Sequence, residues 1–326
     1  MISNELGIVV IGRNEGERLV NCLNSVKRQT NAEVVYVDSG STDGSTTAAV
    51  RLGIKVVNLD ITRPFSAARA RNEGFAALVE LNPNVRFVQF VDGDCELVPG
   101  WLEAALEFLA RRNDVAVVCG RRRERHPETS IYNRLCDIEW NTPIGEATAC
   151  GGDSMIRSDA FKSVGGYRSA LIAGEEPELC LRLRELGWKV WRLDAEMTRH
   201  DAAITRVSQW WRRTVRSGYA YAEIARLHKN SKLRIYAQEA KRAIVWGGLL
   251  PLAIGVGTLV HPTAVLAILI YPAQICRIAM RQSGDKSNSW AYAVFIVLAK
   301  FAELQGLLKF QLRRLSGRAG PLIEYK

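Results

Sequence analysis

Short apolar runs alternate with segments of helical periodicity through the first half of the chain. Near-continuous Val and Ile runs bounded by polar turns are typical of strands that are covered on both faces. The predicted strands are residues 7–11, 33–37, 54–58, 85–91 and 115–119, and the predicted helices are residues 15–29, a segment after residue 45, and residues 66–81. Strands that alternate with helices predict an α/β domain with a doubly wound, mostly parallel sheet.

Polar side chains cluster directly after three of these predicted strands. The clusters are Arg13-Asn14-Glu15, Asp38-Ser39 and Asp92-Gly93-Asp94. In open α/β sheets, ligands bind at the carboxyl ends of the strands. The pattern therefore predicts a binding site built from these three segments.

The C-terminal part has a different pattern, because its apolar runs are much longer. Residues 243–260 form an 18-residue run without a charge, which is just long enough to span a bilayer. His261-Pro262 is a natural turn, and residues 263–280 are apolar apart from Arg277, which could snorkel. We interpret residues 243–280 as a membrane hairpin or a re-entrant pair. The alternative is the buried helical core of a second soluble domain.

A third apolar segment, residues 290–310, is interrupted by Lys300, Glu303 and Gln305. An interfacial amphipathic helix fits these interruptions better than a third span does. A third span would also export residues 309–326, which hold five cations and one acid, against the positive-inside bias. We therefore expect residues 281–326 to form an interfacial helix with a basic tail.

The formal net charge of +10 is concentrated in the C-terminal part. Residues 1–198 hold 24 Lys and Arg against 28 Asp and Glu, residues 199–242 hold 11 against 3, and residues 243–326 hold 9 against 3. A basic segment next to apolar runs favours an anionic membrane surface over nucleic acid as the partner. We expect a catalytic domain over residues 1–198 and basic amphipathic interfacial helices over residues 199–242.

The seven cysteines lie far apart and form no C-x-x-C pair, which fits neither a zinc site nor a disulfide framework. We interpret them as buried small hydrophobic residues in a reducing compartment. The first residues lack a basic segment followed by an apolar run, so no signal peptide is predicted. The expected location is the inner (cytoplasmic) membrane, with the catalytic domain in the cytoplasm.

Asp92 and Asp94 flank a glycine at the end of a predicted buried strand. Two carboxylates at this spacing can hold a hard cation such as Mg²⁺ or Mn²⁺ against diphosphate oxygens. A surface turn is the alternative for so short an acidic motif, and the position after a strand of a parallel sheet favours the metal site. His200 could be a further metal or phosphate ligand, or a hydrogen-bonded structural histidine.

Asp38 ends the second predicted strand and precedes Ser39-Gly40-Ser41. A carboxylate at this point can accept hydrogen bonds from a base N–H or a ribose hydroxyl, and the small residues would let a nucleotide approach the backbone. The alternative is a turn with a helix cap. We prefer the cap for Asp43 and the ligand role for Asp38.

Taken together, these motifs resemble the family-two glycosyltransferases of GT-A fold. The resemblance rests on residues 9–15, 38–44 and 92–94, on residues 70–74, which are similar to an Arg-Asn-x-Gly element, and on residues 151–157 and 164–167, which resemble the acceptor-side region. The motifs follow the family's order over residues 5–195. The resemblance implies a nucleotide-sugar donor, usually a UDP- or GDP-sugar, a divalent metal, and inversion at the anomeric carbon.

The resemblance also gives these residues expected roles. Donor contacts are expected from Ile11, Arg13, Asn14, Glu15, Asp38, Ser39, Arg71 and Asp92; metal contacts from Asp94 and Asp92, with His200 as a weaker candidate; and acceptor or diphosphate contacts from Gly151, Gly152, Glu175, Trp211 and Arg212. Trp211 and Arg212 lie in a segment similar to the Q-x-x-R-W element of processive members, with its letters out of order. An amphipathic helix on lipid headgroups is the alternative for this segment.

Glu176 is the candidate general base. It lies in the first turn of a helix predicted to run to residue 186, and at about 100° per residue it shares the apolar face of that helix. The face consists of Leu179, Cys180, Leu183 and Leu186, with Glu178 and Glu185 pointing away. A carboxylate on an apolar face should meet a cleft or a partner, whereas the helix dipole alone explains the other acids. Family members commonly have Glu-Asp here, with the Asp as base, and this chain has Glu in that position.

The sequence thus predicts an inverting, metal-dependent hexosyltransferase. It would move a sugar from a nucleotide-diphosphate sugar to a hydroxyl of a lipid-linked or polysaccharide-precursor acceptor. The alternatives are a non-catalytic, membrane-bound sugar-nucleotide-binding protein and a processive polysaccharide synthase. A nicotinamide oxidoreductase is disfavoured, because no G-x-G-x-x-G follows the first strand. The arginines at 121, 122, 123 and 125 could contact a lipid diphosphate, and we prefer a solvated role for them.

Overall fold

The computed structural model describes residues 4–282 and 286–316. The described chain divides into two compact units. The first comprises the residues up to Leu171 together with Glu175–Ala203. The second comprises Ile172–Gly174 together with the residues from Ile204 onward.

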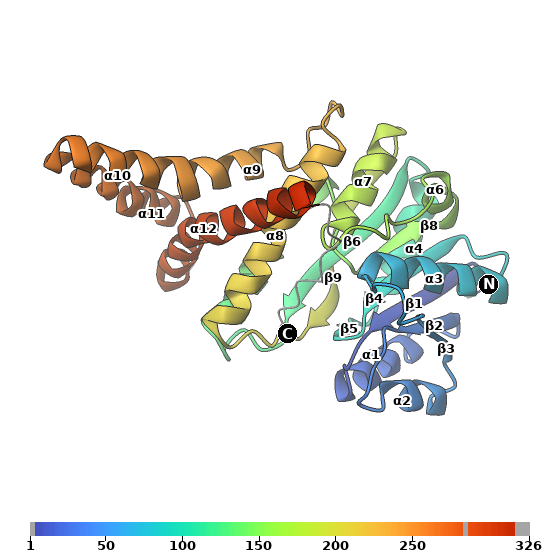
Figure 1. Cartoon of the computed structure of the whole chain (residues 1–326). Coiled ribbons are helices and arrows are strands. Elements are labelled where there is room, and N and C mark those ends of the chain that lie inside the picture. Colours follow the sequence, from blue (N-terminus) through green and yellow to red (C-terminus); the bar gives the residue numbers. More distant parts are fainter. Residues whose placement is uncertain (1–3, 283–285, 317–326) are drawn as a thin grey trace. The chain divides into compact units, whose positions relative to one another are not determined.

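One mixed sheet forms the centre of the first unit (Figure 1). Its strands are β1 (Leu6–Gly12), β2 (Glu33–Asp38), β3 (Lys55–Asn58), β4 (Phe87–Asp92), β5 (Cys95–Leu97), β6 (Val115–Glu124), β7 (Gly145–Ala147), β8 (Ser154–Arg157) and β9 (Lys189–His200). They follow the order β3-β2-β1-β4-β8-β6-β9-β5, with β7 paired to β9. The strands β1 to β4 pair in parallel, and β9 runs parallel to β6. The predicted α/β sheet is confirmed.

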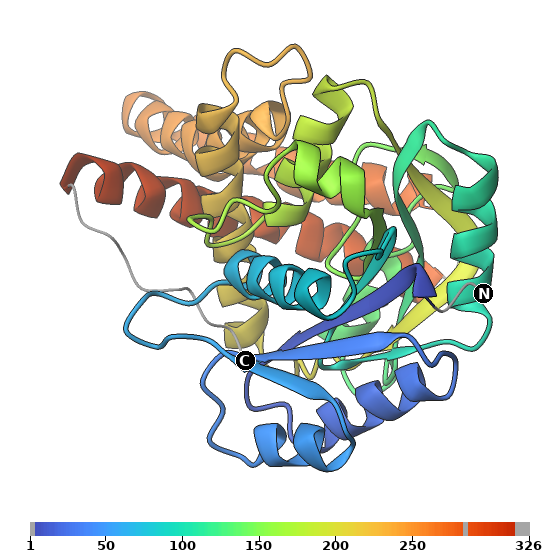
Figure 2. The same ribbon diagram turned by 90° about the vertical axis from the view of Figure 1, so that its right-hand side faces the viewer.

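Helices cover both faces of the parallel strands. They are α1 (Glu17–Lys27), α2 (Ser45–Arg51), α3 (Ala67–Leu81), α4 (Trp101–Arg111), α5 (Ile131–Glu139), α6 (Ser158–Ser163) and α7 (Glu175–Glu185). In Figure 2, α1 and α2 lie on one side of the first strands and α3 lies on the other. This cover explains why β1, β2 and β4 are buried along nearly their whole length.

All five predicted strands are present, with their starts and most of their ends shifted by two residues or fewer. The exception is β6, which continues to Glu124 instead of ending at residue 119. The strands β5, β7, β8 and β9 were not predicted. Three of them have four residues or fewer, and β9 alternates buried with partly exposed positions. The cysteines are free and, apart from Cys276, buried, as expected.

The second unit is helical. Its elements are α8 (Val207–Leu227), α9 (Ala237–Ile244), the π-helical turn η2 (Val245–Leu249), α10 (Leu250–Val260), the 3-10 segment η3 (Pro262–Leu269), α11 (Ile270–Arg281) and α12 (Lys286–Ser316). Among the described residues, three stretches are long and apolar enough to cross a membrane: Ala237–Val260, Pro262–Arg281 and Asn288–Ser316. Only 11% and 6% of the apolar windows of the first two are buried within the protein. The helices of a buried core would have most of these windows buried.

The polar side chains that interrupt the third apolar stretch are paired within the second unit. Lys300 Nζ lies 2.6 Å from Glu303 Oε2, and Trp211 Nε1 donates a hydrogen bond to Gln305 Oε1 at 2.7 Å. Paired polar groups are compatible with a span as well as with an interfacial helix, so the interfacial assignment of residues 290–310 stays a prediction. Residues 317–326 of the expected basic tail lie outside the described residues.

Two glycines let α8 and α12 cross at very short range. A Cβ at Gly218 would lie 2.0 Å from the Glu303 carbonyl oxygen, and a Cβ at Gly306 would lie 2.1 Å from the Val215 carbonyl oxygen. Both neighbours are backbone atoms, which cannot swing aside as the end of a side chain can. Small residues at such crossings let helix backbones approach each other closely. Glycine is therefore required at both positions.

We expect Gly306→Ala to lower the thermal unfolding midpoint of the detergent-solubilised chain. The added methyl group overpacks the crossing, and overpacking typically costs about 1–3 kcal/mol. Gly255→Ala on α10 is the matched control, because a Cβ there would meet no atom of the described chain within 4 Å. Circular dichroism against temperature gives the comparison. Equal midpoints for the two variants would contradict the close crossing.

Candidate active site

The carboxyl ends of three neighbouring strands bring the predicted polar clusters to one edge of the sheet. The pairing sets Asp38 of β2 opposite Gly12 at the end of β1. It sets Asp92 of β4 opposite Ile11. The Gly93 N–H donates to the Ile11 carbonyl at 2.8 Å, which ties the loop after β4 to β1. The strand ends thus meet as the sequence predicted.

Arg71 on α3 gathers three carboxylates at this edge. Its side chain is only 2% exposed. Nη2 lies 2.8 Å from Asp92 Oδ1, and Nη1 lies 2.9 Å from Glu175 Oε1 and 3.3 Å from Glu176 Oε1. One guanidinium thus joins the acidic loop after β4 to the start of α7. The donor contact expected of Arg71 stays a prediction, whereas its contacts with these acids are direct.

The two ends of this cluster have opposite protonation tendencies. Burial raises the pKa of the Asp92 carboxyl, but the Arg71 and Arg122 guanidiniums outweigh this effect and lower it to about 2. Burial, reinforced by the neighbouring Glu175, raises the pKa of Glu176 to about 7, and Arg71 offsets only part of the rise. Asp92 is therefore an anion near neutral pH, and Glu176 is suited to exchange a proton there.

Asp153 and Arg122 form an ion pair that extends the Arg71 cluster and that the sequence did not predict. Asp153 is fully buried and accepts hydrogen bonds from the Asp92 N–H at 2.9 Å and the Thr198 hydroxyl at 2.8 Å. Arg122 Nη2 lies 2.7 Å from Asp153 Oδ2 and 3.4 Å from Asp92 Oδ2. The solvated role preferred for Arg122 is therefore wrong. Asp153 was visible only as part of the acceptor-side motif at residues 151–157.

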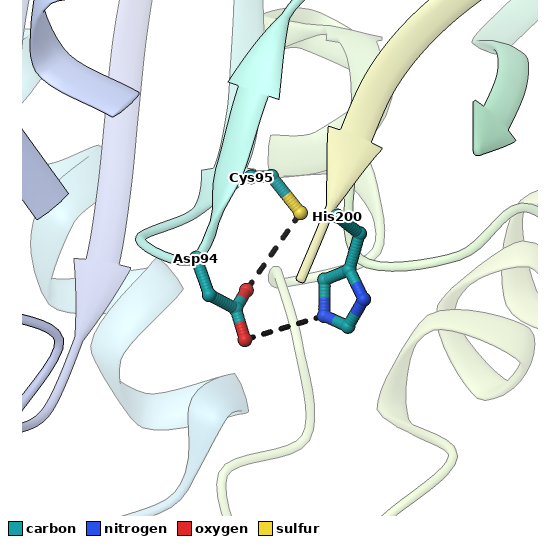
Figure 3. Close-up of side chains that lie close together, drawn as sticks. All are labelled: Asp94, Cys95 and His200. Carbon is teal, nitrogen blue, oxygen red and sulfur yellow. Dashed lines mark hydrogen bonds and ion pairs between the residues drawn. The ribbon is translucent and has the colours of Figure 1, made fainter. Parts of the chain in front are cut away.

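The donor atoms around Asp94 lie close enough together to hold a cation. Oxygen, sulfur and nitrogen donors of Asp94, Cys95 and His200 lie within 4.8 Å of one another, and His200 Nε2 is 3.2 Å from Asp94 Oδ2 (Figure 3). Burial and the nearby Arg122 lower the pKa of His200 to about 4, so the imidazole is neutral. Its Nδ1 is buried without a hydrogen-bond partner among the described residues. The Asp94 carboxylate is a ligand type that suits Mn²⁺ and Mg²⁺, and a neutral imidazole is a common ligand of transition metals.

Hydrogen bonds within the chain hold together the two loops, after β1 and after β2, that are expected to bind the nucleotide. Asp38 is 3% exposed and accepts hydrogen bonds from the Tyr36 hydroxyl and from the N–H groups of Gly40 and Ser41. It thereby fixes the loop that follows β2. Asn14 Oδ1 accepts from the Thr42 N–H at 2.8 Å, which joins this loop to the one after β1.

Other residues of the predicted site lie on the same two loops. The Ser39 N–H donates to the Gly12 carbonyl at 3.0 Å, and Glu15 pairs with Arg18 at 2.7 Å. The Arg13 guanidinium lies over the Phe65 ring, 4.5 Å from its centroid. Asp43 accepts hydrogen bonds from the backbone and hydroxyl of Ser45, the first residue of α2. It forms the predicted turn, but the N-cap residue of α2 is Gly44.

The predicted orientation of α7 is wrong in two places. Glu178, expected to point away, is fully buried and pairs with Arg182 at 2.7 Å and Arg168 at 3.1 Å. Leu186, expected on the apolar face, is 60% exposed and follows the last helical residue. Arginines from outside the first turn decide the burial of Glu178, and the helix periodicity cannot reveal them. Glu176 keeps its expected inward position, with 18% of its side chain exposed.

Gly152 lies against the centre of the cluster. A Cβ at this position would be 2.4 Å from Arg71 Nη2, 2.8 Å from Asp92 Oδ2 and 3.1 Å from Glu176 Oε1. At Gly151 a Cβ would meet only Arg122 Nη2, at 4.0 Å. The predicted acceptor-side glycine at 152 thus lies next to the candidate base and the acids, where any side chain would collide with them. Trp211 and Arg212 belong to the second unit, where they line a pocket together with Val207 and Ser208.

Comparison with known sequences identifies relatives of this domain. Residues 7–165 match the family described as Glycosyl transferase family 2. The chain is similar to glycosyltransferase AglE of Haloferax volcanii, with 25% identity over 197 residues that cover 57% of this chain and 63% of that protein. It is also similar to the succinoglycan biosynthesis protein ExoA of Rhizobium meliloti, with 26% identity over 194 residues, 55% of this chain and 56% of that protein. The chain therefore spans less than two thirds of either relative.

A solved structure shares the fold over nearly the whole chain. It is a mannosyltransferase of Pyrobaculum calidifontis in complex with GDP-Man and Mn²⁺. The TM-score is 0.58 at 16% identity, and the match covers 97% of this chain and 88% of that one. At this identity the likeness establishes the fold, which is the GT-A fold expected from the sequence motifs.

We expect Gly152→Ala to destabilise the first unit and to disturb its carboxylate cluster. The new methyl group would overlap the Arg71 guanidinium, and forcing apart a buried ion pair is strongly unfavourable, at about 3–5 kcal/mol when one partner is lost. Gly151→Ala serves as the control, because its Cβ has open space. A thermal unfolding midpoint lowered only in the Gly152 variant is the expected result. Equal midpoints would show that the cluster tolerates a side chain there.

Proposed function

Residues 7–165 belong to glycosyl transferase family 2, and from this premise we propose that the chain is an inverting, metal-dependent hexosyltransferase. Its donor is a UDP- or GDP-sugar, and its acceptor is a hydroxyl of a lipid-linked saccharide or polysaccharide precursor. The observation that carries the proposal is the Arg71 cluster, in which Asp92 and Glu176 share one guanidinium. An acid at the donor-side loop and a base on α7 are thus held within one site.

Glu176 is the base in this proposal. It takes the proton of the acceptor hydroxyl while that oxygen bonds to the anomeric carbon, and the bond from this carbon to the diphosphate oxygen breaks. Attack from the face opposite the leaving group gives inversion without a covalent enzyme intermediate. A pKa of about 7 lets Glu176 bind the proton during the reaction and release it to solvent afterwards. Arg71 orients Glu176 and holds it next to Asp92.

The donor side has two parts. Asp38, Ser39 and the loop that follows Ile11 bind the nucleotide. Asp94 and His200, with Asp92 beside them, would hold Mn²⁺ or Mg²⁺. Such a cation stabilises the negative charge that develops on the departing diphosphate. Gly151 and Gly152 are the candidates for contact with the acceptor, and Trp211 and Arg212 are the further candidates for contact with its diphosphate.

A lipid-linked acceptor agrees with the character of the second unit. Large apolar side chains are exposed along α10 and η3, among them Leu252, Leu259, Val260 and Leu266. Exposed apolar surface on this scale marks a membrane-binding region. The cations of residues 199–242 favour an anionic leaflet, which is cytoplasmic. We place the protein at the inner membrane with the catalytic unit in the cytoplasm.

We expect Glu176→Gln to reduce kcat/KM for transfer by about 10²- to 10⁴-fold, the usual contribution of a general base. For the wild type, kcat/KM should rise with pH through a limb centred near 7, because the base acts only when it is deprotonated and burial raises its pKa to about 7. The limb should vanish in the variant. A pH series of initial rates is the measurement, and a variant that keeps both rate and limb would remove Glu176 from this role.

Nucleotide diphosphates should stabilise the chain more strongly when Mn²⁺ is present. Thermal unfolding with UDP, GDP or ADP, each with and without Mn²⁺, tests the donor class and the metal together. A ligand at about 100 times its Kd stabilises the folded state by about 2.7 kcal/mol. Asp94→Asn should abolish the increment due to Mn²⁺, while Asp43→Asn, which removes an acid outside the proposed metal ligands, should keep it. Equal stabilisation with and without Mn²⁺ would argue against the metal site.

A further inference from the structure

The three residues that precede α7 belong to the second unit. Ile172–Gly174 groups with the helices that follow residue 204, whereas Glu175 and Glu176 belong to the first unit. Only Glu175 separates Gly174 from the proposed base. The backbone of residues 172–174 therefore leads directly into the first turn of α7.

Two side chains of α8 bind the backbone of Ile172. Arg216 Nη2 donates to the Ile172 carbonyl oxygen at 2.8 Å, and the Ile172 N–H donates to the Glu223 carboxylate. Residues 216 and 223 are seven positions apart, which is about two helical turns, so they lie on one face of α8. Both polar groups of a single peptide residue are thus bound by one helix.

Packing fixes the same segment. The Ile172 side chain packs against the small core of the second unit, which consists of Tyr219, Ala222, Ala243, Leu307 and Phe310. Gly174 has a φ of +77°, and a Cβ there would lie 2.6 Å from Ile224 Cδ1 and 3.4 Å from Ala220 Cβ. Residues 172–174 are therefore held against α8 by apolar contacts, by a close glycine approach and by two hydrogen bonds.

Glu223 is unusual because it places a carboxyl group in a largely buried position. Its Oε2 is buried without a hydrogen-bond partner among the described residues, and burial raises its pKa to about 7 despite the opposing charge of Arg313. Burying a carboxyl group in this way is costly compared with an apolar side chain of similar size. The hydrogen bond from Ile172 is the specific contact that an apolar side chain could not make.

We propose that Arg216 and Glu223 are positioning residues for transfer, because they fix the backbone that leads into Glu176. The second unit then has a role beyond membrane attachment, because its residues 172–174 are covalently joined to the first turn of α7. The inference rests on the proposed function, in which Glu176 is the base. It predicts that loosening Ile172 lowers turnover without weakening donor binding.

Hydrogen–deuterium exchange of the full chain in detergent tests the first step. In Arg216→Gln and Glu223→Ala, a peptide covering residues 172–178 should exchange about tenfold faster, as expected when a buried hydrogen bond is lost. Arg226→Gln is the matched control, since Arg226 is exposed on the last turn of α8. Peptides of α10 should exchange at the wild-type rate in all three variants.

Kinetics test the second step. The donor is whichever of UDP-glucose, UDP-N-acetylglucosamine and GDP-mannose the wild type turns over fastest with Mn²⁺. We expect kcat to fall by at least about tenfold in Arg216→Gln and Glu223→Ala, because small misplacements of a reacting group are costly. The donor KM and the thermal unfolding midpoint should stay near the wild-type values. Arg216→Lys and Glu223→Gln should restore much of the rate, since an ammonium can still donate and an amide oxygen can still accept.

The outcomes separate this proposal from the one it rests on. Wild-type exchange of residues 172–178 in both α8 variants would overturn it, and so would faster exchange with an undiminished kcat. A general loss of the unfolding midpoint without rescue by the conservative variants would show a structural role only, and would overturn it as well. If Glu176 is not the base, the Glu176→Gln variant will retain turnover, which is a separate result.

Discussion

The buried guanidinium of Arg71 is the interaction on which the rest of the site depends. It is 2% exposed and touches acids from two segments that lie about eighty residues apart in sequence. A buried charge is stable only when opposite charges satisfy it. The position of Arg71 on α3 therefore requires the loop after β4 and the first turn of α7 to converge. The fold brings them together, and the ion cluster makes their alignment specific.

The balance of charge in this cluster explains why the site suits a cation. Two guanidiniums, those of Arg71 and Arg122, face the carboxylates of Asp92, Asp153, Glu175 and Glu176. Acids therefore outnumber arginines, and Asp94 adds a further carboxylate beside them. Such an excess can be relieved by protonating one acid or by binding a metal. The pKa of about 7 at Glu176 represents the first route, and the donor set around Asp94 offers the second.

The sequence predicted the parallel strands and the edge at which they end, because burial on both faces leaves a continuous apolar run and each run stops at a polar turn. It predicted Asp92 from its position after such a run, and Glu176 from its place on the apolar face of a helix and from the family resemblance. It did not predict the role of Asp153, which depends on Asp92, Arg122 and Thr198 from three other segments. Nor did it predict the burial of Glu178 by Arg168 and Arg182. Pairings of this kind are set by tertiary contacts that no periodicity records.

The resemblance left one question open, namely whether a glutamate can serve where related enzymes commonly have an aspartate. The additional methylene moves the carboxylate further from the helix, into space that a side chain at residue 152 would occupy. Gly152 leaves that space free, since a Cβ there would lie 3.1 Å from Glu176 Oε1. Arg71 then contacts the same oxygen at 3.3 Å. The longer side chain is thus accommodated by a missing Cβ and oriented by a buried guanidinium, so it has the room and the partner that a base in this position needs.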